Sequence, residues 1–431
     1  MDPAHLIENQ LRAESPARFP SLPLPAEWVT PDYGGRSIVN VAATVARIFG
    51  APISTPPLDP ALTGDLLEGV RRVVFVVVDA LGYAKLLETL DRNPQNGLHA
   101  LLGQGARLAP LTSVFPSTTT AALTSLWSGY SPYEHGFLGY QLFLREYGVR
   151  ANMISFSPVA TDLLGRDQLI AGGLEPENFV ATPSLAQTLA RVDVPVYHLL
   201  AEPYIKSGLS RVQIRDAQLR GFMNASDMWV VLREMVEQKP TPAVFAVYWS
   251  GIDSIGHFYG PSSPTLAAEV DNLAYSFERE FLRALSPAAR RDTLFLLTAD
   301  HGQIDTPPAR AVQLHQHPEL RSHLVMDFAG ESRAAYLYCR NGEAEAARAY
   351  IETRLGDRFL VLDSSAALQA GLFGSGMPAP ETPYRAGDLI VLPRADYSLV
   401  EHAKSRLLLG RHGGLSDQEM LVPLIVRRLD G

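Results

Sequence analysis

The 431-residue sequence has a single cysteine, Cys339, and more acidic than basic residues, 46 against 37. A lone cysteine can form neither an internal disulfide nor a thiolate metal cluster, which fits a reducing compartment. The net charge of -9 provides no overall positive field that could hold long DNA or RNA. Disulfide-stapled scaffolds and proteins that coat nucleic acids are therefore excluded from the expected classes.

Long hydrophobic runs are also lacking, since no stretch approaches the roughly 18 uninterrupted apolar residues of a membrane span. The N-terminus has no basic start followed by an apolar core, so we expect no cleaved leader. Apolar residues make up 46% of the chain without low-complexity bias, which excludes collagen-like, coiled-coil and fully disordered proteins. We expect a soluble, cytoplasmic protein.

The chain is long enough for two or three structural units, at about 150 residues per domain. Residues 1–65 are rich in proline and are expected to form an arm that wraps the rest of the chain, with one helix near 38–49. The remainder, 66–431, is predicted to form the main domain. We place two small α+β insertions in it, at about 137–190 and 325–400.

Unbroken apolar and β-branched runs at 73–78, 243–249 and 293–298 are typical of parallel strands buried on both faces. Shorter runs occur at 194–200 and 389–392, and helical stretches separate the runs. This alternation predicts an α/β fold with a mostly parallel central sheet flanked by helices.

Acidic and imidazole side chains follow the three strongest runs where each run ends, and one more histidine begins a late His-Gly-Gly sequence. These residues are Asp79, Asp253, His257, Asp300, His301 and His412. An aspartate after a strand is usually a helix cap or turn former. However, ligands gather beyond the carboxyl ends of parallel strands, so these groups are expected to converge. Three carboxylates and three imidazoles suit Zn²⁺ or Mn²⁺ better than Ca²⁺, which indicates a dinuclear catalytic metal site.

A nucleophile is available in the segment 115–129, where hydroxyl residues cluster at a predicted helix start. Free backbone N–H groups and the helix dipole there favour an alkoxide or a phosphate oxygen. An ordinary helix cap is the simpler reading of the segment by itself.

Six motifs, in order along residues 72 to 426, resemble those of the alkaline phosphatase superfamily, most closely its type I phosphodiesterase/nucleotide pyrophosphatase branch. The motifs are VVVDALG at 76–82, PSTT at 116–119, SGYSPYEHG at 128–136, DSIGH at 253–257, TADHG at 298–302 and HGGLS at 412–416. The resemblance excludes the N-terminal arm. It implies an alkaline-phosphatase-like fold and hydrolysis of phosphodiester or pyrophosphate bonds, with nucleotides among the expected substrates.

The resemblance also implies roles for single residues. In this superfamily the nucleophile lies ten residues before the glycine that ends its helix, and counting back from Gly129 gives Thr119, with Thr118 as the second candidate. Two divalent ions are implied, most simply zinc, with manganese as the alternative. One ion would be held by Asp253, His257 and His412. The other would be held by Asp79, Asp300, His301 and the Thr119 oxygen, and a phospho-threonine would form during turnover.

The sequence departs from the pattern of the related phosphodiesterases at one position that concerns substrate recognition. Related phosphodiesterases carry an asparagine that contacts a phosphate oxygen, and the corresponding position here is Tyr140. A phenol donates one hydrogen bond, so Tyr140 is a candidate substrate-binding residue, although simple packing explains it equally well. A small phosphorylated substrate is expected in either case.

Other activities on the same scaffold remain open. A phosphomonoesterase or a phosphonate hydrolase is the main alternative, and an isomerase similar to cofactor-independent phosphoglycerate mutase or a non-catalytic binding protein has lower weight. A sulfatase is disfavoured because its Cys/Ser-x-Pro-x-Arg motif is absent at 119–123.

Several further histidines have simpler interpretations. His135 is expected to support the nucleophile helix, whereas His315, His317 and His323 are expected to be surface or loop residues.

Overall fold

The computed structural model describes residues 3–103, 105–402 and 408–431, and its centre is a seven-stranded sheet in the order β2-β18-β9-β1-β8-β6-β7. Pairings among β9, β1, β8, β6 and β7 are parallel, whereas β18 runs antiparallel to both its neighbours. The mostly parallel sheet predicted from the sequence is confirmed. Its strands are β1 (Arg72–Val78), β2 (Arg107–Thr112), β6 (Val196–Ala201), β7 (Gln218–Phe222), β8 (Ala243–Trp249), β9 (Thr293–Thr298) and β18 (Leu421–Arg428).

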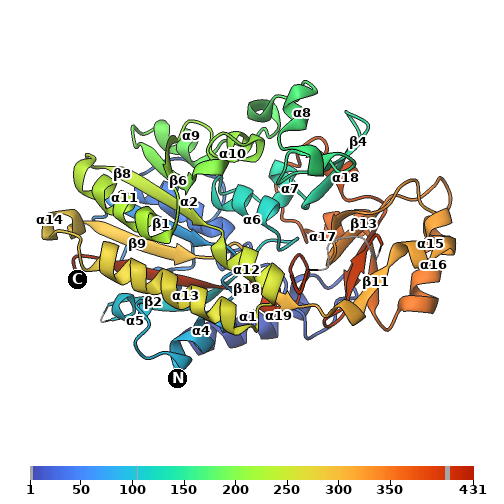
Figure 1. Cartoon of the computed structure of the whole chain (residues 1–431), viewed down its shortest axis with the longest axis horizontal. Helices are drawn as coiled ribbons and strands as arrows, with labels where there is room; N and C mark the ends of the chain where they lie inside the picture. Colours follow the sequence, from blue (N-terminus) through green and yellow to red (C-terminus); the bar gives the residue numbers. More distant parts are fainter. Residues whose placement is uncertain (1–2, 104, 403–407) are drawn as a thin grey trace.

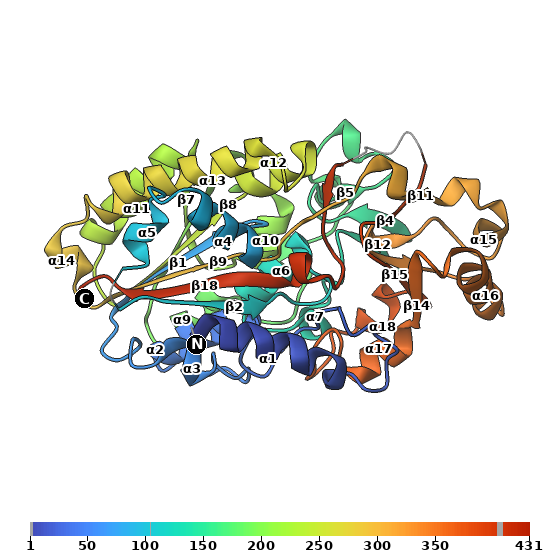
Figure 2. The ribbon, with the colours of Figure 1, turned by 90° about the horizontal axis from the view of Figure 1, so that it is seen from below.

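Helices cover both faces of this sheet, as Figure 2 shows. One layer contains α4 (Tyr83–Arg92), α5 (Leu98–Leu101), α11 (Ala225–Gln238), α12 (Gly251–Tyr259) and α13 (Pro264–Ser276). The opposite layer contains α1 (Pro3–Arg18), α2 (Val39–Ile48), α3 (Pro60–Thr63) and α9 (Leu185–Ala190). Because both faces are covered, every residue of β1 is buried, which explains its unbroken apolar run.

A second, antiparallel sheet of seven strands forms the smaller lobe at one end of the molecule (Figure 1). It joins the two predicted insertions, since β12 pairs with β3 at Gly330 and Gln141. Its strands are β3 (Gln141–Leu144), β4 (Val149–Asn152), β5 (Ser157–Pro158), β12 (Ala329–Glu331), β13 (Ala334–Leu337), β14 (Phe359–Asp363) and β15 (Leu389–Pro393). The short apolar run at 389–392 therefore belongs to this sheet and not to the central one. Every residue of β15 is buried, as in the central strand β1, so hydrophobicity alone does not distinguish the two sheets.

The remaining elements are short, apart from the twelve-residue helix α16 of the smaller lobe. The helices are α6 (Thr119–Leu126), α7 (Pro132–His135), α8 (Gln168–Ala171), α10 (Gly208–Gln213), α14 (Pro287–Arg290), α15 (Pro318–Ser322), α16 (Ala344–Leu355), α17 (Ser364–Ala370), α18 (Thr382–Arg385) and α19 (Asp417–Met420), with a π-helical turn at Phe277–Leu282. The strands are β10 (Ile304–Asp305), β11 (Ala311–Gln313), β16 (Ser398–Val400) and β17 (Gly410–Arg411). No helix in the described ranges is both long and apolar enough to cross a membrane.

The N-terminal segment packs on the main sheet. Helix α2 matches the helix expected near 38–49, but the sixteen-residue helix α1 was not predicted. Its Leu11 is fully buried in the main core, and the Ile38 amide donates to the Thr112 carbonyl at 3.0 Å, at the edge strand β2. Pro16 lies within α1, near its C-terminal end, where it removes one backbone hydrogen bond of the helix. The proline content therefore suggested an arm where α1 forms, and burial of one face of α1 in the main core stabilises this helix.

Candidate metal centre and active site

The register of the central strands aligns their carboxyl ends. β1 lies between β8 and β9, with Val78 opposite Trp249 and Val77 opposite Thr298. Asp79 directly follows β1, Asp300 lies two residues beyond β9, and Asp253 is in the first turn of α12, which follows β8. Parallel pairing in register therefore brings three carboxylates to one edge of the sheet.

The first group of ligand atoms surrounds the Nε2 atom of His301. This nitrogen lies 3.5 Å from Asp79 Oδ1, 3.4 Å from Asp300 Oδ2 and 3.1 Å from the hydroxyl oxygen of Thr119. Asp79, Asp300 and His301 are all buried, and their ligand atoms lie within 4.8 Å of one another. Sequence analysis had assigned these four residues to one ion, and the structure brings them together.

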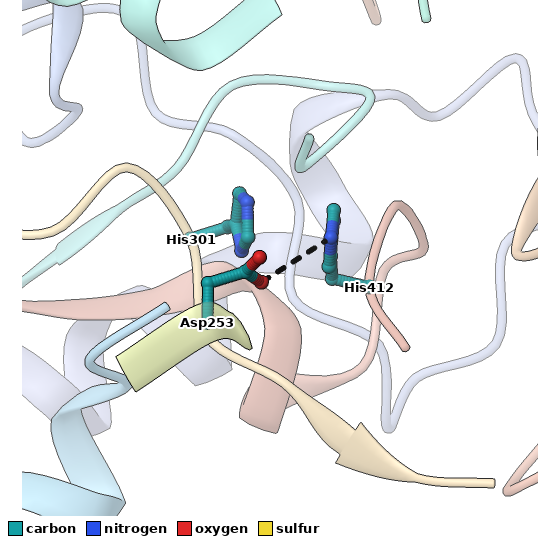
Figure 3. A group of neighbouring side chains, drawn as sticks. All are labelled: Asp253, His301 and His412. Carbon is teal, nitrogen blue, oxygen red and sulfur yellow. Dashed lines mark ion pairs between the residues drawn. The ribbon is translucent and has the colours of Figure 1, made fainter. Parts of the chain in front are cut away.

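The second group is formed by α12 and the loop after β17. His257 Nε2 lies 3.2 Å from Asp253 Oδ1, and His412 Nε2 lies 3.7 Å from the same oxygen. The two Nε2 atoms are 3.3 Å apart. Figure 3 shows Asp253 and His412 facing each other beside His301. The rings of His301 and His412 stack with their centroids 3.7 Å apart, so the two groups are adjacent.

The hydrogen-bond pattern of these residues leaves ligand atoms available for divalent ions. Among the described residues, the buried atoms Asp79 Oδ1 and Asp300 Oδ2 have no hydrogen-bond partner, although such atoms are normally satisfied. Each of the three histidines donates from Nδ1 to a backbone carbonyl, at 2.7 Å for His257, 3.0 Å for His301 and 3.1 Å for His412. That pattern leaves every Nε2 lone pair directed at the cluster, as in metal-ligating histidines.

The electrostatics of the cluster point the same way. Burial raises the pKa of Asp79 well above its ordinary value, and the nearby Asp300 and Asp253 raise it further. Burial lowers the pKa of His412 well below its ordinary value, and His301 and His257 add to this effect. Clustered carboxylates and imidazoles provide a site whose negative charge a divalent ion would neutralise.

Different hydrogen bonds distinguish the two nucleophile candidates, Thr119 and Thr118. Thr119 begins α6, and its hydroxyl faces His301, whereas the Thr118 hydroxyl donates to Glu331 Oε1 at 2.6 Å. Gly129 has a positive φ of 79°, which suits the glycine expected just after this helix. Only Thr119 offers its oxygen to the metal cluster.

Residues behind the ligands hold them in place. The Tyr248 hydroxyl donates to Asp79 Oδ2, and the Gln303 side-chain amide donates to Asp253 Oδ1 at 2.6 Å. Asp300 Oδ1 accepts backbone N–H bonds from Ala80 at 3.1 Å and from His301 at 2.9 Å. Each carboxylate is thus oriented through hydrogen bonds from outside the cluster.

Two pockets are both lined by Thr119 and Asp253. The first, which we call the β6 pocket, has a volume of about 210 Å³ and is lined by Trp127, His198, Ser210 and Gln213 among others. The second, the β12 pocket, has a volume of about 530 Å³ and is lined by Tyr140, Glu331, His257, Arg411 and His412 among others. A substrate at Thr119 therefore has room in two pockets.

Tyr140 lines the β12 pocket as a substrate-binding residue would, but its phenol oxygen also accepts a hydrogen bond from Asn152 at 2.6 Å. Its backbone N–H donates to Glu331 Oε1 at 2.7 Å. The substrate-binding role stays a prediction.

Sequence analysis missed several residues of the site, including His198, Tyr248, Glu331 and Arg411. Arg411 had a usable signal, since it directly precedes His412. Glu331 had none, because it comes from the second sheet and meets Thr118 only in the folded chain.

The remaining histidines lie where sequence analysis expected them. His135 is fully buried and its Nε2 lies 3.0 Å from the Ser125 hydroxyl of α6. His315, His317 and His323 contact Glu401, Tyr350 and Glu343 in the smaller lobe.

This fold and this convergence of ligands define a class, the alkaline-phosphatase-like α/β hydrolases. Within it, the model of the type I phosphodiesterase / nucleotide pyrophosphatase family matches residues 73–415. The chain belongs to this family of metal-dependent hydrolases of phosphoester bonds. The resemblance noted in the sequence is confirmed.

Solved structures of similar fold include murine ectonucleotide pyrophosphatase / phosphodiesterase 5, with a TM-score of 0.62 and 15% identity over 82% of this chain and 87% of that chain. An inactive threonine-to-alanine variant of that protein, in complex with AMP, matches with a TM-score of 0.61 and 16% identity, covering 82% of this chain and 87% of that one. Phosphonoacetate hydrolase from Sinorhizobium meliloti, in complex with phosphonoacetate, matches with a TM-score of 0.59 and 17% identity over 82% and 89% of the two chains. Comparison with curated proteins gives no match.

Proposed function

We propose that this protein hydrolyses phosphodiester or pyrophosphate bonds through a phospho-threonine on Thr119, at a site for two divalent ions, most simply zinc. The observation that carries the proposal is the position of the Thr119 hydroxyl, 3.1 Å from His301 Nε2, beside two buried carboxylate oxygens without a hydrogen-bond partner in the described chain. Asp79, Asp300 and His301 would hold the ion next to Thr119, and Asp253, His257 and His412 would hold the other.

Bound divalent ions would supply the positive charge that acidifies the threonine hydroxyl and neutralises the phosphate oxygens. The oxygen of Thr119 attacks phosphorus and loses its proton to solvent. A new O–P bond forms while the P–O bond to the leaving group breaks, and the leaving oxygen takes the bonding pair. Water then attacks the same phosphorus, the bond to Thr119 breaks, and its oxygen is reprotonated. Two inversions give overall retention at phosphorus.

The β6 pocket suits the part of the substrate that stays on Thr119. Its wall contains Trp127 and the buried His198, whose rings meet edge to face with centroids 4.5 Å apart. Neither ring nitrogen of His198 has a partner among the described residues, and polar Ser210 and Gln213 line the same space. An aromatic wall with polar groups fits a nucleoside, and the AMP complex of the mouse neighbour supports this choice.

The test compares Thr119→Ala with Thr118→Val on bis(4-nitrophenyl) phosphate, 4-nitrophenyl phosphate and phosphonoacetate. We expect Thr119→Ala to lower kcat by about 1000-fold or more while keeping most of the bound metal, because the attacking oxygen is lost. Thr118→Val is expected to keep substantial activity, since its hydroxyl faces Glu331. Full activity in Thr119→Ala would refute the nucleophile assignment. If the unaltered protein prefers the monoester, it is a phosphomonoesterase, and if it prefers phosphonoacetate, it is a phosphonate hydrolase.

A further inference from the structure

The β6 pocket extends along helix α6, from Thr119 at its first residue to Trp127 just after its last. Thr119, Leu123 and Trp127 follow one another at intervals of four residues on one face of the helix, and all three line the pocket. Eight residues of helix span about 12 Å, which is comparable to the length of a nucleoside 5′-phosphate. The pocket therefore begins at the proposed nucleophile and ends where only a long retained group would reach.

A buried imidazole without a partner lies at the Trp127 end of this pocket. His198 is in the middle of β6 and lines the pocket, and its ring meets that of Trp127 edge to face with centroids 4.5 Å apart. The residue is 1% exposed, and neither ring nitrogen has a hydrogen-bond partner among the described residues. Buried polar groups are normally satisfied, so these nitrogens are available to a ligand that enters the pocket.

The chemistry of His198 suits a ligand that both accepts and donates hydrogen bonds. Burial lowers the pKa of His198 to about 3, so the ring is neutral at pH 7. A neutral imidazole carries one N–H donor and one acceptor nitrogen. The edges of nucleobases carry carbonyl or ring-nitrogen acceptors together with N–H donors. An apolar group at the same place would leave both nitrogens of His198 unsatisfied, which lowers affinity.

The wall around His198 is held in place by the fold. Gln213 of α10 donates from its side-chain amide to the Thr124 hydroxyl of α6 at 2.9 Å, which ties these two helices together. The Phe75 ring of β1 packs edge to face on Trp127 with centroids 5.2 Å apart. A ligand therefore does not have to order this wall when it binds, and less of its binding free energy is lost.

We propose that His198 is a specificity-determining residue that hydrogen-bonds the far end of the group retained on Thr119, and thereby selects substrates whose retained group carries a nucleobase over those whose retained group is short. The inference rests on the proposed function and adds to it the residue that recognises the retained group. Because His198 lies at the Trp127 end of the pocket, its effect should be confined to substrates long enough to reach it. The selectivity should therefore appear as a difference between substrates that share a leaving group.

The experiment uses thymidine 5′-(4-nitrophenyl phosphate) and methyl 4-nitrophenyl phosphate, which release the same 4-nitrophenol but leave thymidine monophosphate or methyl phosphate on Thr119. In His198→Phe we expect kcat/KM to fall about 10-fold or more on the thymidine ester, as for loss of a buried hydrogen bond, and less than about 2-fold on the methyl ester. His198→Gln, whose amide both donates and accepts, should recover part of the loss. Tyr197→Phe is the matched control, because it removes a hydroxyl from the preceding residue of β6, which points to the other face of the sheet and stacks on Phe245.

Binding provides a second readout that does not need turnover. Titration calorimetry with the metal-loaded Thr119→Ala protein should show about 10-fold weaker binding of thymidine monophosphate when His198→Phe is added, with little change for methyl phosphate. His198→Leu takes the place of the Phe variant if that variant fails to fold. Equal losses on both esters, no loss on either, or an unaltered protein that does not prefer the thymidine ester would overturn the inference. An unaltered protein that cleaves neither ester would instead overturn the proposed function.

Discussion

At the scale of single residues, the candidate ligand Asp79 is oriented by a hydrogen bond from a residue outside the ligand set. Tyr248 is a buried phenol, and its hydroxyl donates to Asp79 Oδ2, the oxygen that does not face His301. Burial and the nearby Asp79 raise the pKa of Tyr248 well above its ordinary value, so it stays a donor. The bond fixes which oxygen of Asp79 points into the cluster.

The first prediction is that Tyr248→Phe lowers the affinity for metal by about 10- to 100-fold, the usual cost of losing such a supporting hydrogen bond. Competition with a chelator, followed by metal analysis, measures the change. Tyr197→Phe is the control, because Tyr197 packs on Phe245 away from the ligands. Unchanged metal affinity in Tyr248→Phe would show that the hydrogen bond does not orient Asp79.

The second prediction concerns acid stability. Burial lowers the pKa of His198 to about 3, against 6.5 for an exposed histidine. Between these values the unfolded chain binds a proton that the folded chain does not, so stability falls as the pH falls below about 6.5. One such histidine contributes a slope of about 1.4 kcal/mol per pH unit. His198→Phe should remove that slope, measured by denaturant unfolding of metal-free protein from pH 6.5 to 4.

The control for this prediction is Leu189→Ala, a core substitution in α9 with no ionisable group. It should lower stability by a similar amount at every pH. A pH slope in His198→Phe as steep as in the unaltered protein would contradict the assignment of acid sensitivity to His198.

At the scale of elements, one ion pair ties the smaller lobe to the loop that carries His412. Arg333, between β12 and β13, donates to both oxygens of Glu419 at 2.7 Å, and both side chains are buried. Glu419 in turn accepts the backbone N–H of Gly414 at 2.9 Å. The pair therefore braces the His-Gly-Gly loop from the second sheet.

The third prediction is that Arg333→Met destabilises the protein by about 3–5 kcal/mol, because Glu419 is left charged and buried. Denaturant unfolding measures the loss. The double variant Arg333→Met with Glu419→Gln should recover part of it, since no buried charge remains. If Arg333→Met left the free energy of unfolding nearly unchanged, other contacts would hold the lobe and the loop together.

At the scale of the whole molecule, the site is assembled from distant parts of the chain. Strand ends of the central sheet provide Asp79 and Asp300, and α12 provides Asp253 and His257. His412 comes from the loop after β17, beside a wall built by the second sheet. Ions held by ligands from such distant parts of the chain would link these parts together and stabilise the fold.

The fourth prediction is that the folded protein holds about two equivalents of zinc, with manganese as the alternative, and that chelation lowers its thermal unfolding midpoint. Binding only to the folded state adds about 2.7 kcal/mol per site at a free ion concentration 100 times the dissociation constant. Metal analysis and calorimetry measure both quantities, and Thr119→Ala should keep most of the effect. A protein that purifies and folds identically without metal would argue against the two-ion site.

The local sequence predicts structure well where the environment of a residue depends mainly on its neighbours in the chain. Buried runs such as 73–78 predicted the central strands, and the order of six motifs identified the family. The same reasoning missed α1, because the prolines of residues 1–65 suggested an arm. Burial against a distant segment decided that helix, and no local pattern records such burial.

The sequence by itself determined the α/β class, the family and the candidate metal-binding side chains, because strand-end position and ligand chemistry are local properties. Only the tertiary structure decided which hydroxyl faces the cluster, that two insertions combine into one sheet, and that Glu331 and Arg411 line a pocket beside Thr119. Those outcomes depend on register and packing between segments hundreds of residues apart, and such contacts leave no signature in the spacing of either segment.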